Sequence, residues 1–186
     1  DRVVDLVQDG YDMALRGGRI TDSSLVSRPV CQFNLVLVAS PDYLARYGVP
    51  RTPEELARHR LLTRRFLGGR VSLWNFQALD GSITTLDCEN AVMTLSSPET
   101  LAQSAVAGAG IAEVGTHHAW NHLRAGRLMV LLMDAHHPGS FAMTLQYPHR
   151  ALVAPRVRAT VEYLLEAFAQ LEELHVPLSA LRQYEA

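Results

Sequence analysis

The sequence contains no lysine, and its seventeen basic side chains, all arginines, are outnumbered by nineteen carboxylates, giving a formal net charge of −2. The use of arginine in place of lysine is typical of proteins encoded by GC-rich bacterial genomes. The sequence has no stripe of basic residues interleaved with aromatic residues. We therefore expect that this segment by itself does not bind the phosphate backbone of a nucleic acid. Any contact with nucleic acid is therefore predicted to be made elsewhere.

Cysteine is nearly absent, and long apolar runs are absent altogether. Cys31 and Cys88 lie in apolar, strand-like runs, which predicts buried free thiols and no disulfide framework. No apolar run reaches the roughly eighteen residues that a membrane span requires, and no secretory leader opens the chain. Metalloprotease, serine-hydrolase and phosphate-loop motifs are also missing, so we predict no catalytic residues.

The most informative stretch that is present runs from residue 96 to 115. Ser96 and Glu99 have the spacing of a capping box, and Pro98 is suited to a first helical turn. Ser97, directly before Pro98, is also predicted to cap the helix. The predicted helix ends at Gly108, and the apolar residues 111–114 predict a buried strand. A strand, helix and strand in this order form a crossover in a parallel sheet. Because helix N-termini then lie beside the carboxyl ends of the strands, we expect a small-molecule site that favours anions.

The remainder of the chain alternates between strands and helices. Asp80-Gly81 between two apolar runs predicts a β-hairpin, and therefore a mixed sheet. Residues 5–10 are expected to end a short helix, and the tail after His175 has no clear pattern. We predict strands over 12–16, 34–39, 61–63, 71–76, 82–88, 127–133 and 141–146, and helices over 40–47, 52–59, 116–124 and from 155 onward.

A series of short motifs follows a fixed order along nearly the whole chain to about residue 171. They are DGYDMALRGG at residues 9–18, VASPDYL at 38–44, RTPEEL at 51–56, AGAGI at 107–111, GRL at 126–128 and PRVR at 155–158. Each motif is weak alone, but together their order and spacing resemble the effector-binding domain of LysR-type transcriptional regulators.

This resemblance implies a periplasmic-binding-protein-like fold of type II, with two α/β subdomains of mixed sheets joined by two crossover strands. The first regulatory subdomain would comprise residues 1–38 and 145–171, and the second residues 39–144, followed by a C-terminal tail at 172–186. In the family a strand, a helix and a DNA-binding winged helix-turn-helix come before the position of Asp1. The first subdomain is accordingly expected to be incomplete in this chain.

The resemblance also implies an effector site in the cleft between the subdomains, and it requires neither cofactor nor metal. The residues carried over to this site are Arg16, Gly17, Thr63, Arg64, Asn90, Ser96, Ser97, Glu113, Gln146 and Tyr147. The arginines and the helix N-terminus favour a carboxylate-like effector. Glu113 departs from the apolar pattern of the family and is expected either to bond a neighbouring arginine or to face the cleft.

Two groups of histidines offer alternatives to a purely structural role. His117, His118 and His122 include a pair with the i, i+4 spacing of a shared metal site, but a solvated helix face is the simpler interpretation because no third ligand lies at a suitable distance. The sequence His136-His137-Pro138-Gly139 is interpreted as a polar turn.

The function implied is that of a cytoplasmic, ligand-sensing regulatory domain that performs no chemistry. Its expected partners are a second or further copies, as a homodimer or homotetramer, DNA through the upstream domain, and RNA polymerase, with no membrane contact. A periplasmic solute-binding protein of a transport system is the alternative, and a small-molecule enzyme on the same scaffold is a third. A helix-turn-helix or a secretory leader upstream of Asp1 would separate the first two.

Overall fold

The computed structural model describes residues 5–17, 25–66, 69–139, 141–148 and 154–186. Its contacts divide the chain into two compact units. Unit 1 contains residues 34–139 and 176–186, and unit 2 contains the described residues of 2–33 and 140–175. Whether these units correspond to the two regulatory subdomains stays a prediction. In the described ranges no helix is long and apolar enough to cross a membrane.

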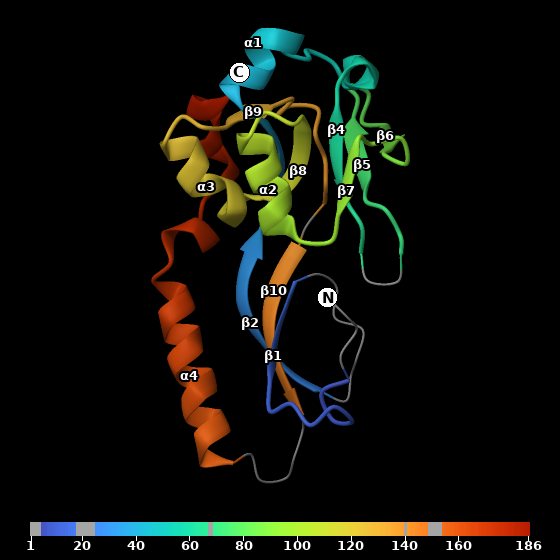
Figure 1. The fold of residues 1–186 in the computed structure, drawn as a ribbon. Helices are drawn as coiled ribbons and strands as arrows, with labels where there is room; N and C mark the ends of the chain where they lie inside the picture. Colours follow the sequence, from blue (N-terminus) through green and yellow to red (C-terminus); the bar gives the residue numbers. More distant parts are fainter. Residues whose placement is uncertain (1–4, 18–24, 67–68, 140, 149–153) are drawn as a thin grey trace. The chain divides into compact units, whose positions relative to one another are not determined.

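Unit 1 is built on a five-stranded mixed sheet with the strand order β7-β4-β8-β3-β9 (Figure 1). The strands are β3 Leu35–Ala39, β4 Leu61–Arg64, β7 Met93–Leu95, β8 Ile111–Gly115 and β9 Met129–Leu131. β7, β4 and β8 are parallel, whereas β3 is antiparallel to both of its neighbours. The predicted parallel crossover through residues 96–115 is therefore confirmed, because β7 and β8 both pair with β4.

The two faces of this sheet bury different sets of side chains. Helices α2, Pro98–Val106, and α3, Thr116–Arg124, pack with Leu62 and Ala112 in one apolar cluster. Helix α1, Pro41–Tyr47, and the 3-10 helix η1, Pro53–Arg58, contribute to a second cluster that contains Ile111. Adjacent residues of a strand point to opposite faces, so Leu62 and its neighbour Leu61 enter different clusters.

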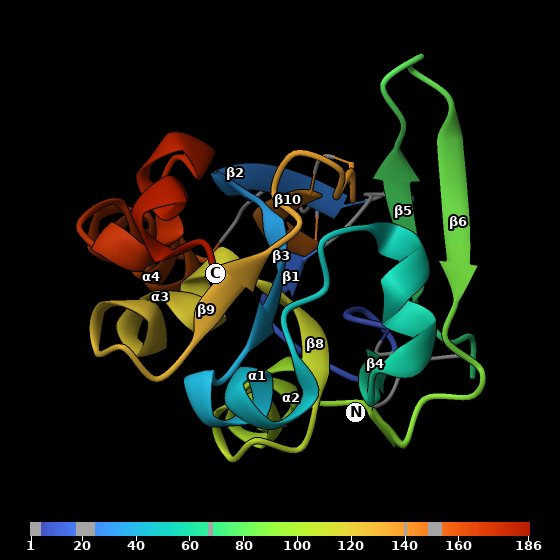
Figure 2. The same ribbon diagram turned by 90° about the horizontal axis from the view of Figure 1, so that it is seen from above.

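The hairpin predicted at Asp80-Gly81 is confirmed. Strands β5, Leu73–Gln77, and β6, Ile83–Asp87, pair antiparallel around it, and Gly81 adopts a φ of 82°, which a side chain would strain. Figure 2 shows the hairpin extending away from the five-stranded sheet. Trp74 and Phe76 of β5 point inward and are buried in the second cluster.

The C-terminal residues, which showed no clear sequence pattern, are an integral part of unit 1. The 3-10 helix η3, Leu178–Tyr184, buries Leu181 in the cluster beneath α2 and α3. The ring of Tyr184 meets Trp120 edge-on at 5.8 Å, and the Ala186 N–H donates to the Val130 carbonyl. Residues 176–186 therefore complete the packing around α3 and β9.

Unit 2 is a three-stranded antiparallel sheet of order β1-β10-β2, accompanied by a long helix. Its elements are β1 Ala14–Gly17, β2 Leu25–Phe33, β10 Phe141–Pro148, α4 Pro155–Ala169 and the 3-10 helix η2 Glu172–Leu174. Val157 and Val161 of α4 pack with Leu145 of β10. A register shift lies between Met143 and Thr144 of β10.

Several predicted local features are wrong in detail. Of the two predicted caps of α2, Ser97 is confirmed and accepts the Thr100 N–H at 3.3 Å, whereas Ser96 is not the cap, because Pro98 occupies the first helical position directly after Ser97. Thr116 is the first residue of α3 and not its cap. Residues 6–10 form turns, since the Asp5 carboxylate accepts the Val7 and Gln8 N–H groups. The start of the predicted helix there, at Val3, lies outside the described residues.

Candidate functional site

The candidate site in unit 1 is the edge at which the three parallel strands end. Arg64 closes β4 and lies in register with Leu95, the last residue of β7. Ser96 and Ser97 follow directly and lead into α2, while β8 ends at Gly115 and leads into α3. Thr63, Arg64, Ser96 and Ser97 are thus brought to one edge. This is where open α/β sheets bind ligands.

Arg64 is the main positive group of this edge. Its side chain is half-buried, and burial lowers the pKa of its guanidinium. The guanidinium lies 4.9 Å from the Phe66 ring centroid, and the buried Nε has no hydrogen-bond partner among the described residues. A buried guanidinium Nε without an acceptor favours an added anion, because charge-assisted hydrogen bonds are among the strongest in proteins.

The histidines at the start of α3 belong to the same neighbourhood. Burial lowers the pKa of His118, the Glu99 carboxylate raises it, and the Arg64 guanidinium lowers it further. His117 is also partly buried, and burial followed by the charge of His118 lowers its pKa to about 4. The helix face predicted to be solvated is therefore partly buried at both residues. Among the described residues no group of three possible ligands could hold a metal ion.

Glu113 lies on the opposite face of the sheet, with Thr63. The carboxylate Oε1 lies 2.9 Å from His136 Nε2, and Ser72 Oγ donates to Oε2 at 3.4 Å. The Glu113 and His136 side chains are only 6% and 4% exposed. Among the described residues Glu113 bonds His136 and Ser72 and no arginine, so the expectation of an arginine partner is wrong, and burial keeps the carboxylate from lining an open edge.

The same contact corrects the interpretation of residues 136–139 as a polar turn. His136 is buried against Glu113 and lies 5.8 Å from the Phe76 ring centroid, while its neighbour His137 is exposed. Close by, burial raises the pKa of the Cys88 thiol to about 12, and the Glu113 charge adds to this effect. Cys88 is therefore the buried, unreactive thiol that the sequence predicts.

Asn90 does not share the edge formed by Arg64 and Ser97. It lies in an exposed turn before β7, where the Val92 N–H donates to the carbonyl of Leu61 at the start of β4. The parallel direction of β7 and β4 places this turn at the amino ends of the strands, opposite the candidate site.

Unit 2 carries the remaining predicted site residues on two faces of its sheet. Arg16 pairs with Thr144, and Ala14 with Gln146, so Arg16, Thr144 and Gln146 share one face. Gln146 is 2% exposed and donates from Nε2 to Ser27 Oγ at 3.2 Å, while its Oε1 has no partner within the described ranges.

Tyr147 points to the other face of that sheet and packs in the cluster with Leu145 and α4. The structure therefore separates it from Gln146, its neighbour in sequence. Gly17 lies beside Phe33, where an added Cβ would make ordinary van der Waals contact at 3.6 Å. A residue with a side chain would therefore fit at this position.

Sequence reasoning missed the side chains that surround the predicted ones, namely Glu99 and His118 near Arg64, Ser72 and His136 near Glu113, and Ser27 and Thr144 near Gln146. Only His118 had a usable signal. It lies in the first turn of the helix that directly follows a buried parallel strand, the position at which such folds place ligand-binding groups.

Comparison with known proteins places this arrangement in a family. The family model of the LysR substrate binding domain matches residues 1–169. An HTH-type transcriptional repressor of Pseudomonas aeruginosa is 29% identical over 181 residues, which are 97% of this chain and 56% of that protein. The HTH-type transcriptional activator AaeR of Escherichia coli is 34% identical over 128 residues, which are 69% of this chain and 40% of AaeR.

A solved structure supports the same assignment. CrgA, a LysR-type transcriptional regulator from Neisseria meningitidis, has a TM-score of 0.78 and 28% identity, covering 89% of this chain and 55% of CrgA. The chain spans about half the length of the curated relatives it matches. The predicted type II periplasmic-binding-like fold class is confirmed, and the chain belongs to the LysR substrate binding domain family.

Proposed function

We propose that this chain is the ligand-sensing regulatory domain of a bacterial DNA-binding transcription regulator, and that it binds a small anionic effector at the edge where β4 and β7 end. The family assignment supports the regulatory role. Arg64 carries the proposal of an anion, because its half-buried guanidinium has an Nε without an acceptor in the described residues. Its register partner Leu95 ends β7, and Ser96 and the α2 cap Ser97 follow directly.

The remaining residues of the site would orient the effector. Ser97 holds the N-terminus of α2 in place, and His118 can donate or accept a hydrogen bond in its neutral form. In unit 2, Arg16, Thr144 and Gln146 share one polar face, which is the part of that unit suited to a polar ligand. Gly17 and Ser96 would contribute backbone contacts. Asn90, Glu113 and Tyr147 have no place in this proposal, given their positions.

The regulatory mechanism that we propose is a population shift. An effector that binds one arrangement of the subdomains more tightly than another stabilises that arrangement by the difference in binding free energy. The chain performs no chemistry in this scheme. One relative is named a repressor and another an activator, so the direction of regulation differs among similar proteins.

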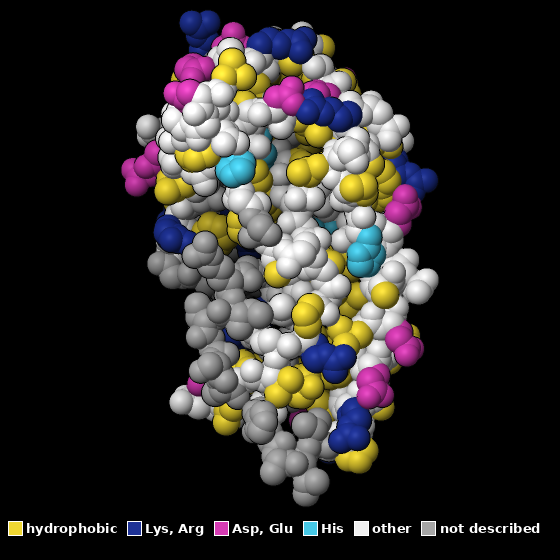
Figure 3. Space-filling model, turned by 180° about the vertical axis from the view of Figure 1, so that it is seen from behind, with side chains coloured by type: hydrophobic (Ala, Val, Ile, Leu, Met, Phe, Trp, Pro, Cys, Tyr) yellow, Lys and Arg dark blue, Asp and Glu magenta, His cyan; other side chains and the backbone are white. Residues whose placement is uncertain are grey.

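The proposed setting is a cytoplasmic homodimer or homotetramer that contacts DNA through a separate domain and acts on RNA polymerase. On the face drawn in Figure 3, arginine and carboxylate side chains are interspersed, which supports DNA contact elsewhere. The relatives compared above are transcription regulators, so they lend no support to the transport alternative.

The test is a thermal-shift screen of small carboxylates against the full chain, followed by calorimetric titration of Arg64→Gln with the best ligand. We expect the binding free energy to weaken by about 1.5 to 3 kcal/mol, which raises Kd roughly ten- to a hundredfold, because a charge-assisted hydrogen bond is removed. Arg58→Gln, which changes an exposed arginine at the end of η1, is the matched control. Equal affinities of the Arg64→Gln variant and the unaltered chain would exclude Arg64 from the site.

A further inference from the structure

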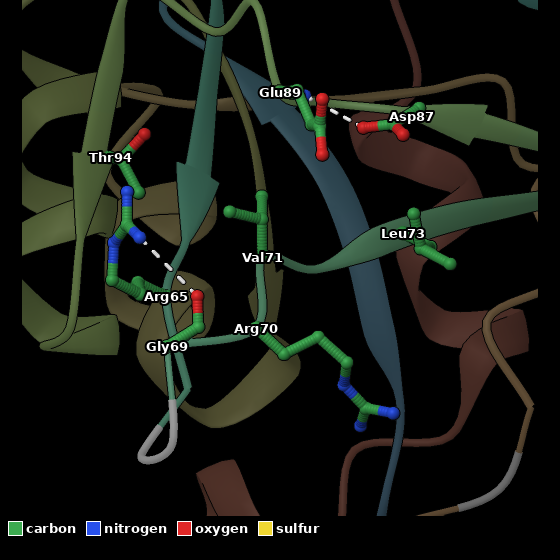
Figure 4. A pocket seen from close by; sticks show the side chains of 8 residues that line it. All are labelled: Arg65, Gly69, Arg70, Val71, Leu73, Asp87, Glu89 and Thr94. Carbon is green, nitrogen blue, oxygen red and sulfur yellow. Dashed lines mark hydrogen bonds between the residues drawn. The ribbon is translucent and has the colours of Figure 1, made fainter.

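A pocket of about 480 Å³ lies in unit 1 beside β7 and the hairpin β5–β6. Figure 4 shows its two arginines on opposite sides of Val71, with Arg65 beside Thr94 and Arg70 pointing away from it. Arg65 donates to the Gly69 carbonyl at 3.3 Å. The charged side chains of this pocket therefore do not converge on one point, and we assign it no ligand.

The last eleven residues of the chain, 176–186, are here called the C-terminal strap. Unit 2 includes residues 140–175, whereas the strap belongs to unit 1, so the chain passes from one unit to the other after residues 33, 139 and 175. The first two passages adjoin the strands β2 and β10. The third lies beyond residue 169, where the match to the family model ends.

Apolar contacts and a strand edge hold the C-terminal strap on unit 1. The Leu181 side chain is fully buried and Val176 is 7% exposed, both in the cluster that contains Trp120 of α3. Glu185 forms a parallel bridge with Val130 of β9, which is an edge strand of the five-stranded sheet. Figure 2 shows the end of the chain beside β9. The strap thus packs on α3 and covers part of the sheet edge.

Polar side chains of the strap contact residues 132–139, here called the exit segment because they lead from β9 to the second passage. The Arg182 guanidinium forms an ion pair with the Asp134 carboxylate. Glu185 Oε1 accepts the Met133 N–H at 3.2 Å, and Glu185 Oε2 lies 3.2 Å from Arg182 Nη1. The strap therefore contacts the chain just before it leaves unit 1.

The exit segment begins with a strained residue. Leu132 has a φ of 53°, whereas the other described residues with a positive φ are glycines. A bulky residue keeps such a conformation only where the surrounding structure holds it. The Leu132 carbonyl accepts the His136 N–H at 2.8 Å, and the His137 N–H donates to the Asn75 carbonyl at 2.8 Å. Both bonds report on the course of the exit segment without involving the strap.

We propose that the C-terminal strap holds the exit segment in its strained course, and that release of the strap frees this segment without unfolding the sheet of unit 1. The release begins at the ion pair of Arg182 and Asp134, because its side chains are 53% and 80% exposed and such pairs are weak. Local opening of this kind is typical of regions held by exposed contacts. The strap thereby couples the third passage between the units to the second.

None of these residues belongs to the proposed effector site at Arg64. The inference therefore does not rest on the proposed function, and its test requires no effector. A change that releases the strap acts on a passage between the units from a surface outside that site.

Hydrogen exchange of the full chain, resolved to single amides by NMR, tests the inference. The variant Arg182→Ala/Glu185→Ala removes the polar contacts of the strap and leaves its apolar contacts in place. We expect the His136 and His137 amides to exchange at least about fivefold faster, while the amides of β3 and β8 keep their rates. Ser179→Ala, at an exposed position of the same 3-10 helix η3, is the matched control and should change none of these rates.

Two outcomes of this experiment would overturn the inference. If the His136 and His137 amides keep their rates, the strap shields at most the Met133 amide that it contacts. If the amides of β3 and β8 also exchange faster, the strap only adds to the overall stability of unit 1.

The reciprocal variant Asp134→Ala changes the exit segment and not the strap. Because coupling between two sites is mutual, release from this side should speed exchange of the Glu185 amide, which donates to the Arg182 carbonyl. We expect an increase of about two- to fivefold, since the ion pair that is removed is exposed. His137→Ala, at an exposed position of the exit segment, is the control. An unchanged rate at Glu185 in Asp134→Ala would refute the coupling.

Discussion

The buried contact between Glu113 and His136 makes a quantitative prediction about the stability of unit 1. The Glu113 carboxylate has two partners, His136 Nε2 at 2.9 Å and the Ser72 hydroxyl at 3.4 Å. The variant His136→Ala leaves this buried carboxylate with the longer, weaker bond alone. Leaving a buried carboxylate without its main partner costs about 3 to 5 kcal/mol, and the remaining bond to Ser72 offsets part of this. We expect His136→Ala to lower the free energy of unfolding by about 3 kcal/mol.

The size of the pairwise contribution is measured by a double-mutant cycle. Glu113→Ala alone should cost about 2 kcal/mol, because it removes a buried side chain and leaves the His136 imidazole unpaired. The double variant should lower the free energy of unfolding by about 3 kcal/mol, which is well below the sum of the two single effects. Both polar groups are removed in it, so no unpaired polar group stays buried. The expected coupling energy is therefore about 2 kcal/mol.

Urea unfolding followed by tryptophan fluorescence suits this measurement, because Trp74 and Trp120 are both buried in unit 1. His137→Ala is the matched control. His137 neighbours His136 but is exposed, so we expect a change below about 0.5 kcal/mol. Effects of Glu113→Ala and His136→Ala that add within about 0.5 kcal/mol would show that the contact contributes no net energy, and our reasoning about it would be wrong.

Three further predictions concern other buried positions. Gly110→Ala would place its Cβ 2.2 Å from the Arg60 carbonyl oxygen, so we expect a loss of about 2 kcal/mol or more in urea unfolding, and an unchanged midpoint would contradict this close approach. The pKa of His117 is lowered to about 4, so the unfolded chain binds a proton below about pH 6.5 that the folded chain does not bind until near pH 4. Stability should therefore fall as the pH drops through this window, by about 1 to 2 kcal/mol from His117 after allowance for solvent screening, and His117→Gln should reduce the slope. Because the pKa of Cys88 is raised to about 12, a thiol-specific reagent at pH 8 should modify Cys88 only after unfolding, and its prompt modification in the folded chain would refute this burial.

The sequence by itself determined those features that depend on a few neighbouring residues. The Asp80-Gly81 turn requires a positive φ that glycine tolerates, and it produced the expected hairpin. Ser40 before Pro41 marked the start of α1, where its hydroxyl accepts the Tyr43 N–H at 3.2 Å. The order of such local signals along the chain was also sufficient to identify the family.

Only the tertiary structure decided which predicted site residues share a surface. Gln146 and Tyr147 are adjacent in sequence, yet the alternation of a strand sends one to the polar face of unit 2 and the other against α4. The partner of Glu113 lies 23 residues away in a segment that resembles a polar turn. The free energy of burying a charge depends on which groups the whole fold brings to it, and local sequence patterns do not contain that information.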